Sequence, residues 1–204
     1  MSFFKENRTA GIALIILGVI NLIGALAALV GVFTAENIIV SAAVACIGPI
    51  IMAVLYFRFG VSVKNGAISK KIDILAYFVR LAGLSEIILA IFNLWYNVET
   101  GGAWAAIGAL IISIILGLII LAVSGRINDG KQDTLDKVIW IILVVLFAIS
   151  AILDIFAVIG VIAAGIAINL AILTTLVLPI ISFIIDVFML LLLFDSDVKR
   201  EMNM

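Results

Sequence analysis

Histidine is missing from this sequence, and cysteine occurs only once, at Cys46. The absence of histidine removes the commonest metal ligand and the commonest general base from the chain. A single cysteine can form neither an intrachain disulfide nor a cysteine metal cluster, so we expect Cys46 to be a small buried apolar residue. Metal sites built from histidine and cysteine are therefore excluded.

Charged residues are also scarce, at 12% of the chain, and the formal net charge is only −1. This balance provides no basic field, so a nucleic-acid partner is not expected. The sequence also lacks the HExxH, GxSxG, GxxxxGK[ST] and dinucleotide-binding motifs. It identifies no cofactor, and an enzyme is the least favoured function class.

The chain is instead rich in apolar residues, which make up 66% of it and give a mean hydropathy of +1.43. Soluble domains are about 45–50% apolar. A water-soluble core of 204 residues could not hide such an excess, because domains of this size keep much of their surface exposed. The composition therefore predicts an integral membrane protein in contact with the lipid bilayer.

Long apolar runs between short polar stretches predict the membrane-spanning helices, since about 20 apolar residues cross a bilayer. The apolar stretch 138–194 is too long for one span, so we expect it to turn back at residues 160–165. Another turn is expected at residues 97–102, and a long polar link at residues 124–137. The predicted fold class is an all-α bundle of six transmembrane helices in a single domain. The predicted spans are residues 10–33, 38–59, 72–95, 103–123, 138–159 and 166–194.

The basic residues predict the orientation of the bundle in the membrane. Every lysine and arginine except Arg80 lies in or next to the two ends and the two longer polar links. Basic residues prefer the cytoplasmic side of a membrane, so we expect both termini in the cytoplasm. Trp95, Tyr96 and Trp104 would then lie at the outer interface. The expected location is the plasma membrane of a prokaryote.

A weak internal repeat suggests three helical hairpins in one orientation, related by an axis along the membrane normal. Pro49 and Pro179 lie at similar depths in the second and sixth predicted spans. Each proline frees the carbonyl of the residue four positions earlier, at Ala45 and Thr175. Such an interruption either lines a cavity or only kinks the helix, and the sequence leaves both open.

Arg80 and Asp186 lie inside predicted spans, at equal counted depths of about 12 Å from the cytoplasmic ends. Ionisable groups at such depth are costly unless they are paired. Equal depth and opposite charge therefore predict an ion pair. The alternative is that the long Arg80 side chain reaches back to the cytoplasmic headgroups.

Glu86 and Asp154 have no basic residue at their predicted depth in the outer half of the membrane. Carboxylates in a low dielectric bind protons more readily or hold a cation. The sequence therefore predicts a proton- or cation-binding site at Glu86 and Asp154, joined by Asn21, Asn93 and Ser150. The alternative is that these acids only form hydrogen bonds across helix contacts. Asp154 and Asp186 are not expected to meet, because their counted depths differ.

Two function classes follow from these residues. The favoured one is a small transporter or channel-like subunit in which Glu86 and Asp154 bind the proton or cation. The alternative is a non-catalytic membrane scaffold or an accessory subunit of a larger complex, whose polar stripes contact partner helices. Either class is compatible with a homo-oligomer or with a partner membrane subunit. A water-accessible cavity at Glu86 would favour transport, and a dry centre would favour the scaffold.

Overall fold

The computed structural model describes residues 7–35, 39–163, 176 and 178–204, and within these ranges it contains helices and no strand. Five segments are long and apolar enough to cross a membrane, namely α1, α2 with α3, α4, α5 and α6. Helix α7 is also apolar but shorter. Residues 164–175 and 177, which belong to the predicted turn at 160–165 and to the predicted sixth span, lie outside the described residues. An all-helical protein with several membrane-spanning helices is thus supported, and the count of six stays a prediction. The helices are α1 (Asn7–Thr34), α2 (Val40–Ala45), α3 (Ile47–Lys64), α4 (Lys71–Gly101), α5 (Ala103–Ile127), α6 (Thr134–Ala163), α7 (Leu178–Leu193) and α8 (Ser196–Glu201).

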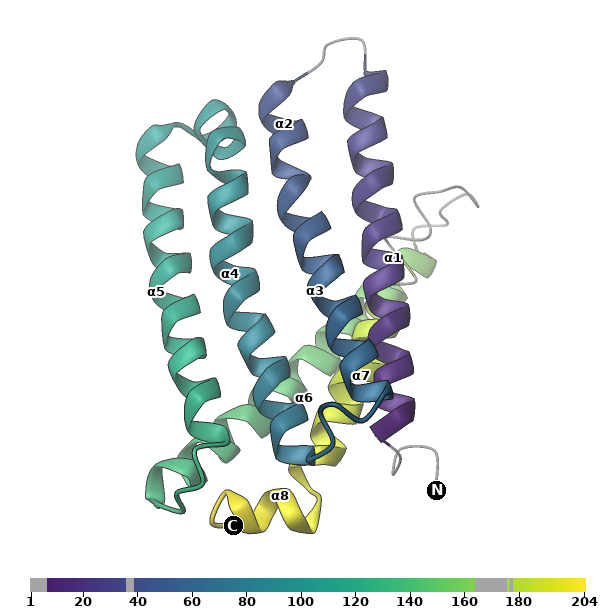
Figure 1. Cartoon of the computed structure of the whole chain (residues 1–204). Helices are drawn as coiled ribbons and strands as arrows, with labels where there is room; N and C mark the ends of the chain where they lie inside the picture. The colour runs from purple at the N-terminus through teal and green to yellow at the C-terminus, as the bar shows by residue number, and fades with distance from the viewer. Residues whose placement is uncertain (1–6, 36–38, 164–175, 177) are drawn as a thin grey trace.

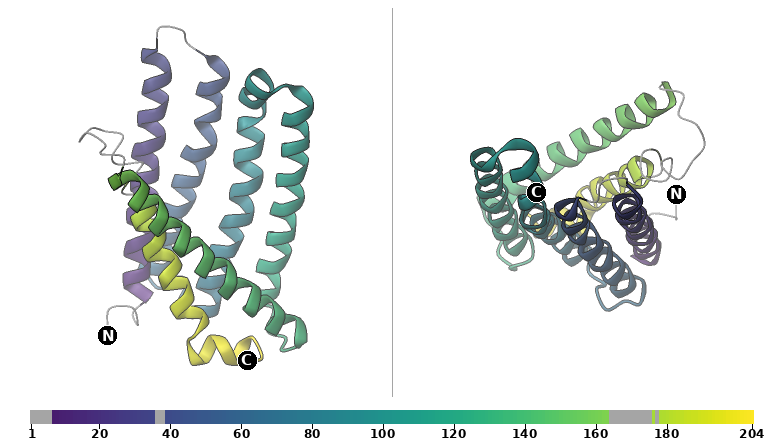
Figure 2. Two further views of the ribbon diagram at one scale, coloured as in Figure 1. Left: turned by 180° about the vertical axis from the view of Figure 1, so that it is seen from behind. Right: turned by 90° about the horizontal axis from the view of Figure 1, so that it is seen from above.

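Four of the spanning segments stand side by side as two antiparallel hairpins (Figure 1). The first hairpin is α1 with α2 and α3, and the second is α4 with α5. Helices α6 and α7 cross this row obliquely, and α6 packs mainly against α7 (Figure 2). Seen from above, most of α6 stands apart from the hairpins, with α7 between α6 and α1. The start of α1 and the short helix α8 lie at the same end of the molecule.

Each hairpin is closed by a pair of glycines at which the two backbones touch. A Cβ placed on Gly11 of α1 would lie 2.8 Å from the carbonyl oxygen of Gly60 on α3, and the reverse distance is also 2.8 Å. Gly83 of α4 and Gly117 of α5 form the same contact, at 2.9 and 2.8 Å. Because no side chain intervenes, the helices of each hairpin can pack at close range, as small residues allow in membranes.

The second predicted span is interrupted at Cys46, close to Pro49. Helix α2 ends at Ala45, Cys46 lies between the helices, and α3 begins at Ile47. Pro49 has no N–H to donate to the Ala45 carbonyl, so the regular hydrogen-bond ladder breaks at this point. The interruption lies beside α4, where Gly48 faces Leu89 and Phe92.

Two predicted turns begin too early in the sequence, because the preceding helices continue into them. Residues 97–101 belong to helix α4, and the chain reverses at Gly102 alone, which has a left-handed φ of 84°. Glycine adopts this φ without steric strain, so one residue suffices. Gly160, predicted to start a turn, lies inside α6, which continues to Ala163. The rest of the predicted turn at 160–165 lies outside the described residues.

The predicted polar link at 124–137 is shorter, because α5 continues to Ile127 and α6 begins at Thr134. The side chain of Asp133 accepts hydrogen bonds from the backbone N–H groups of Leu135 and Asp136, at 2.8 and 3.3 Å. The Asp136 carboxylate accepts one from the backbone N–H of Asp133 at 3.0 Å. These reciprocal bonds satisfy free N–H groups of the first turn, and so start the helix four residues earlier than its apolar run.

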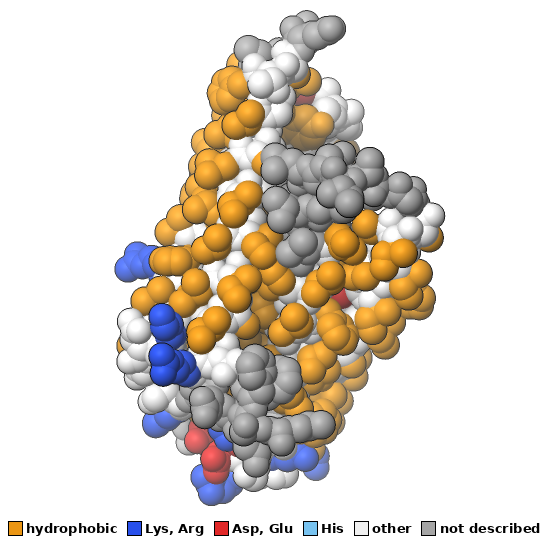
Figure 3. Space-filling model, turned by 90° about the vertical axis from the view of Figure 1, so that its right-hand side faces the viewer, with side chains coloured by type: hydrophobic (Ala, Val, Ile, Leu, Met, Phe, Trp, Pro, Cys, Tyr) orange, Lys and Arg blue, Asp and Glu red, His pale blue; other side chains and the backbone are white. Residues whose placement is uncertain are grey.

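The best-packed part of the molecule is the end that carries α8. Fully buried side chains gather there from α3, α4, α7 and α8, including Phe59, Leu75, Met189 and Val198. The Trp140 indole of α6 donates a hydrogen bond of 2.7 Å to the Leu193 carbonyl, and Lys71 forms an ion pair with Asp195. On the face shown in Figure 3, apolar side chains cover the flank, and most basic groups lie towards this end. The opposite ends of the hairpins are less buried.

Candidate intramembrane binding sites

A polar cleft lies between α4 and α5, on the side of the Gly83–Gly117 contact away from α8. It holds about 290 Å³. Helix α4 contributes a stripe at intervals of three and four residues, which places these side chains on one helix face. The stripe consists of Glu86, Leu89, Ala90, Asn93 and Asn97, and the opposite wall of α5 consists of Ala106, Ala109, Leu110 and Ser113.

The cleft exists because the α5 wall is made largely of small side chains. Ala106, Ala109 and Ser113 are too short to fill the space opposite the polar stripe of α4. A Cβ added at Gly117 of α5, by contrast, would meet the α4 backbone at Gly83. The two helices therefore touch at Gly117 and leave room beyond it.

Glu86 is the one ionisable side chain among the residues that line this cleft. None of the ion pairs among the described residues includes it. Asn93 donates its amide N–H to the Leu89 carbonyl at 2.8 Å, which leaves its amide oxygen without a hydrogen bond in the described chain. The cleft thus combines a carboxylate with amide and hydroxyl oxygens and no competing cation from the described protein.

The structure does not bring Glu86 and Asp154 together. Asp154 lies on α6 and lines a different groove of about 180 Å³, with Ile155, Val158, Ile159, Ile180 and Phe183. Asn93 accompanies Glu86, and Ser150 lies one turn from Asp154 on α6. Asn21 lies on α1 and lines neither of these two spaces. The predicted group of five residues is therefore divided: Glu86 and Asn93 lie at one cleft, Asp154 and Ser150 lie on α6, and Asn21 joins neither pair.

The predicted ion pair between Arg80 and Asp186 is not formed. Arg80 is exposed on α4 and takes part in none of the ion pairs among the described residues. Asp186 is 6% exposed and faces α6, where the Ser150 hydroxyl and the Asp154 carboxylate interact with it. The two aspartates that were expected to lie at different depths are neighbours, because α6 and α7 run obliquely and counted residues do not measure their depth (Figure 2).

A signal for this contact is present in the sequence. Residues 149–156 read ISAILDIF and residues 181–188 read ISFIIDVF, with five identical positions of eight. Ser150 and Asp154 of α6 thus correspond to Ser182 and Asp186 of α7. A repeated serine–aspartate spacing on two helices predicts that the same polar faces meet, and it identifies a pairing that the depth estimate missed.

A second group of acids lies outside the spans, around Arg126 at the α5–α6 link. Arg126 forms ion pairs with Asp129 at 2.9 Å, Asp133 at 2.6 Å and Asp136 at 3.7 Å. The hydrogen bond from Arg126 holds the pKa of Asp133 below its ordinary value. This group fixes the link between two helices. In the described part of the chain, no cluster of three or more Asp, Glu, Cys or His residues has the geometry of a metal site.

Comparison with protein-family models, with curated proteins and with solved structures finds no match to this chain. Its function is therefore argued from its own residues.

Proposed function

We propose that this protein is a small transporter or channel-like subunit that binds a small inorganic cation in the α4–α5 cleft, with Glu86 as the charged ligand. The observation that carries the proposal is the cleft itself, a space of about 290 Å³ that reaches an unpaired carboxylate within a membrane-spanning helix. A cleft at Glu86 supports transport over the scaffold, because a water-accessible cavity at this residue is the feature that favours transport.

The energetic argument starts from the cost of the charge. An ionised carboxylate within a membrane is expensive unless a partner neutralises it, and such residues commonly mark ion pathways. Carboxylate, amide and hydroxyl oxygens are the ligands that hard cations such as Ca²⁺ and Mg²⁺ prefer. Glu86, Asn93 and Ser113 supply one of each type at the cleft. A cation in the cleft would offset the cost of the Glu86 charge.

The basic residues support an orientation for this cleft. Lys64, Lys71, Arg126 and Arg200 lie at the ends of helices that meet near α8, which we propose is the cytoplasmic end. The N- and C-termini are then cytoplasmic, and the cleft opens in the outer half of the membrane. Trp104, which is 89% exposed at the opposite end, fits an interfacial tryptophan there. The ligand would reach Glu86 from outside the cell, and the membrane would be the plasma membrane of a prokaryote.

Thermal unfolding of the detergent-purified protein tests this function with a panel of monovalent and divalent cations at constant neutral pH. A cation at about 100 times its dissociation constant should stabilise the folded protein by about 2.7 kcal/mol. Glu86→Gln should abolish the shift, because it keeps the shape of the side chain and removes the charge. Asp154→Asn makes the corresponding acid-to-amide change in a different groove and should retain the shift. If no cation stabilises the wild type more than Glu86→Gln, the cleft is not a cation site.

The competing function is a scaffold or accessory subunit, in a homo-oligomer or with another membrane subunit. It is favoured by the large apolar area of α5 and α6, on which Ile112 and Phe156 are 67% and 64% exposed. Lipid alone could cover this area. A defined oligomer by light scattering in detergent, together with no cation shift, would favour the scaffold.

A further inference from the structure

The contact between α6 and α7 joins two copies of one short motif. Ser150 and Asp154 on α6, and Ser182 and Asp186 on α7, are each separated by four residues within the repeated octapeptide. Four residues bring a serine and an aspartate to the same face of a helix. Each helix thus presents one hydroxyl and one carboxyl group on a single stripe.

The antiparallel register places these stripes against each other. Ser150 of α6 interacts with Asp186 of α7. Because the two helices run antiparallel, a step of four residues forward along α6 lies opposite a step of four residues backward along α7. The same register therefore sets Asp154 at the level of Ser182. The two aspartates are offset by about 6 Å along the helices, the rise of four residues. At this offset the two carboxyl groups are close enough to influence each other electrostatically.

If both aspartates were ionised, each would keep a buried carboxylate oxygen without a hydrogen-bond partner among the described residues. The Oδ2 atoms of Asp154 and Asp186 are buried, and neither has a hydrogen-bond partner among the described residues. Asp186 as a whole is only 6% exposed. A buried acceptor without a partner costs about 1–3 kcal/mol, and more if it is charged.

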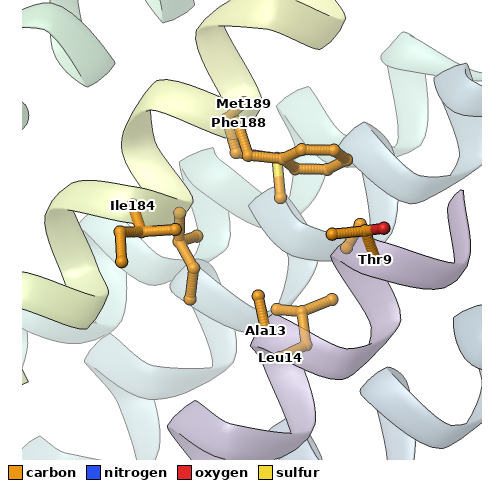
Figure 4. A pocket seen from close by; sticks show the side chains of 8 residues that line it. Thr9, Ala13, Leu14, Ile184, Phe188 and Met189 are labelled. Carbon is orange, nitrogen blue, oxygen red and sulfur yellow. The ribbon is translucent and has the colours of Figure 1, made fainter. Parts of the chain in front are cut away.

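None of the ion pairs among the described residues includes Asp154 or Asp186. Helix α3 contributes Tyr56, whose phenol lies in the field of Asp186, and α6 contributes Asp154. On the α1 side, α7 meets a small, mainly apolar pocket lined by Thr9, Ala13 and Leu14 of α1 (Figure 4). On α4, the exposed Arg80 belongs to none of the ion pairs. At the far end of α7, Lys71 is paired with Asp195.

We propose that Asp154 and Asp186 form a proton-binding pair, which holds one proton between α6 and α7 at neutral pH. Two carboxyl groups this close in a low dielectric do not both ionise, and a shared proton leaves one negative charge instead of two. The proton also turns one carboxyl oxygen into a donor, which satisfies a group that is otherwise without a partner. This site is separate from the Glu86 cleft and does not depend on it.

Because the pair lies in the contact between α6 and α7, its protonation affects the stability of the fold. Helix α6 makes its main contact with α7 and only a slight one with α5. Loss of the shared proton would place two like charges in that contact. The folded chain then binds more protons than the unfolded chain, so its stability falls as the pH rises through the titration of the pair. Protonation would thus control how firmly α6 is held.

Infrared spectroscopy of the full chain in micelles tests the pair, because a protonated carboxyl group has its own C=O stretching band. The wild type should show this band at neutral pH and lose it as the pH is raised. In Asp154→Asn, the band of Asp186 should disappear at a pH lower by about one unit or more, since coupled carboxyl groups interact by at least that amount. Asp186→Asn should remove the high-pH band altogether.

Glu86→Gln is the matched control, since it removes a carboxylate from the other cleft and should leave the band and its titration unchanged. Asp154 is less buried than Asp186, so Asp154→Asn decides the question if Asp186→Asn does not fold. The proposal is overturned if the wild type has no protonated carboxyl band at neutral pH, or if Asp154→Asn titrates like the wild type. A titration that moves with sodium or potassium concentration would replace the proton by a metal cation.

Discussion

The glycine contact between α1 and α3 allows a sharp test of the packing, by the substitution Gly11→Ala. A Cβ at this position would lie 2.8 Å from both the Gly60 carbonyl oxygen and the Lys64 Cα atom, and closer still to the Lys64 backbone nitrogen. All three are backbone atoms, so no rotamer change can remove the clash. Helices α1 and α3 must move apart.

The size of the effect follows from these distances. Carbon contacts are favourable at about 3.5–4.0 Å, so the crossing must open by roughly 1 Å. Overpacking of a tight contact costs about 1–3 kcal/mol. We expect the upper end of this range, about 3 kcal/mol, because side chains around the crossing, among them Leu14 and Phe59, lose contacts when the helices separate.

Gly31→Ala is the matched control on the same helix, since a Cβ there meets no atom within 4 Å. Alanine favours a helix over glycine by about 0.5–1 kcal/mol, so this variant should be as stable as the wild type or slightly more stable. The free energy of unfolding is measured by titration with a denaturing detergent in mixed micelles. Equal stability of Gly11→Ala and Gly31→Ala would show that α1 and α3 do not cross at Gly11.

Three further predictions concern the end of the molecule that carries α8. Asp133→Asn should lower the melting temperature at neutral pH, and the difference from wild type should vanish in acid. Its bond from Arg126 holds the pKa of Asp133 below the ordinary 3.8, so the stabilisation is complete above that value and is lost as the pH falls through the lowered pKa. Trp140→Phe removes the hydrogen bond to the Leu193 carbonyl and should cost about 1–3 kcal/mol in the same unfolding titration, because that buried carbonyl loses a partner. Asp195→Ala removes the cap of α8, which accepts from the Asp197 N–H at 3.0 Å, and should expose α8 to limited proteolysis.

Much of the fold could be predicted from the sequence, because apolar runs of bilayer length have few alternatives to a spanning helix. The ends of the helices were harder to predict, since a helix can continue into polar residues beyond its apolar run. Residues 97–101 are polar enough to suggest a turn, yet they continue α4 until Gly102 reverses the chain. Asp133 and Asp136 belong to a polar stretch, yet their side chains start α6. A glycine conformation decided the first boundary and local hydrogen bonds decided the second, and hydropathy decided neither.

The spacing of Glu86, Asn93 and Asn97 within a single helix places them on one face of α4, where they line the cleft. The pairing of acids between different helices could not be predicted in the same way. A depth counted from the end of a span equals a depth in the membrane only if the helix stands upright. Helices α1, α3, α4 and α5 run nearly parallel to one another, whereas α6 and α7 are inclined to them (Figure 2), so all of these helices cannot stand upright together. The counted depths of Asp154 and Asp186 therefore led to the wrong partners.

A register argument avoids this error, because it compares two helices with each other instead of with the membrane. For antiparallel neighbours, one contact fixes all the others, since a step forward on one helix is a step backward on its partner. The repeated serine–aspartate motif predicts that contact without any depth, as two identical polar stripes satisfy each other best when each serine lies opposite the other aspartate. The interaction of Ser150 with Asp186 is one half of this arrangement. Tilting the two helices together changes the depth of both aspartates and leaves their register unchanged. The acid pair is thus a property of the α6–α7 contact and would persist at any inclination of these helices in the membrane.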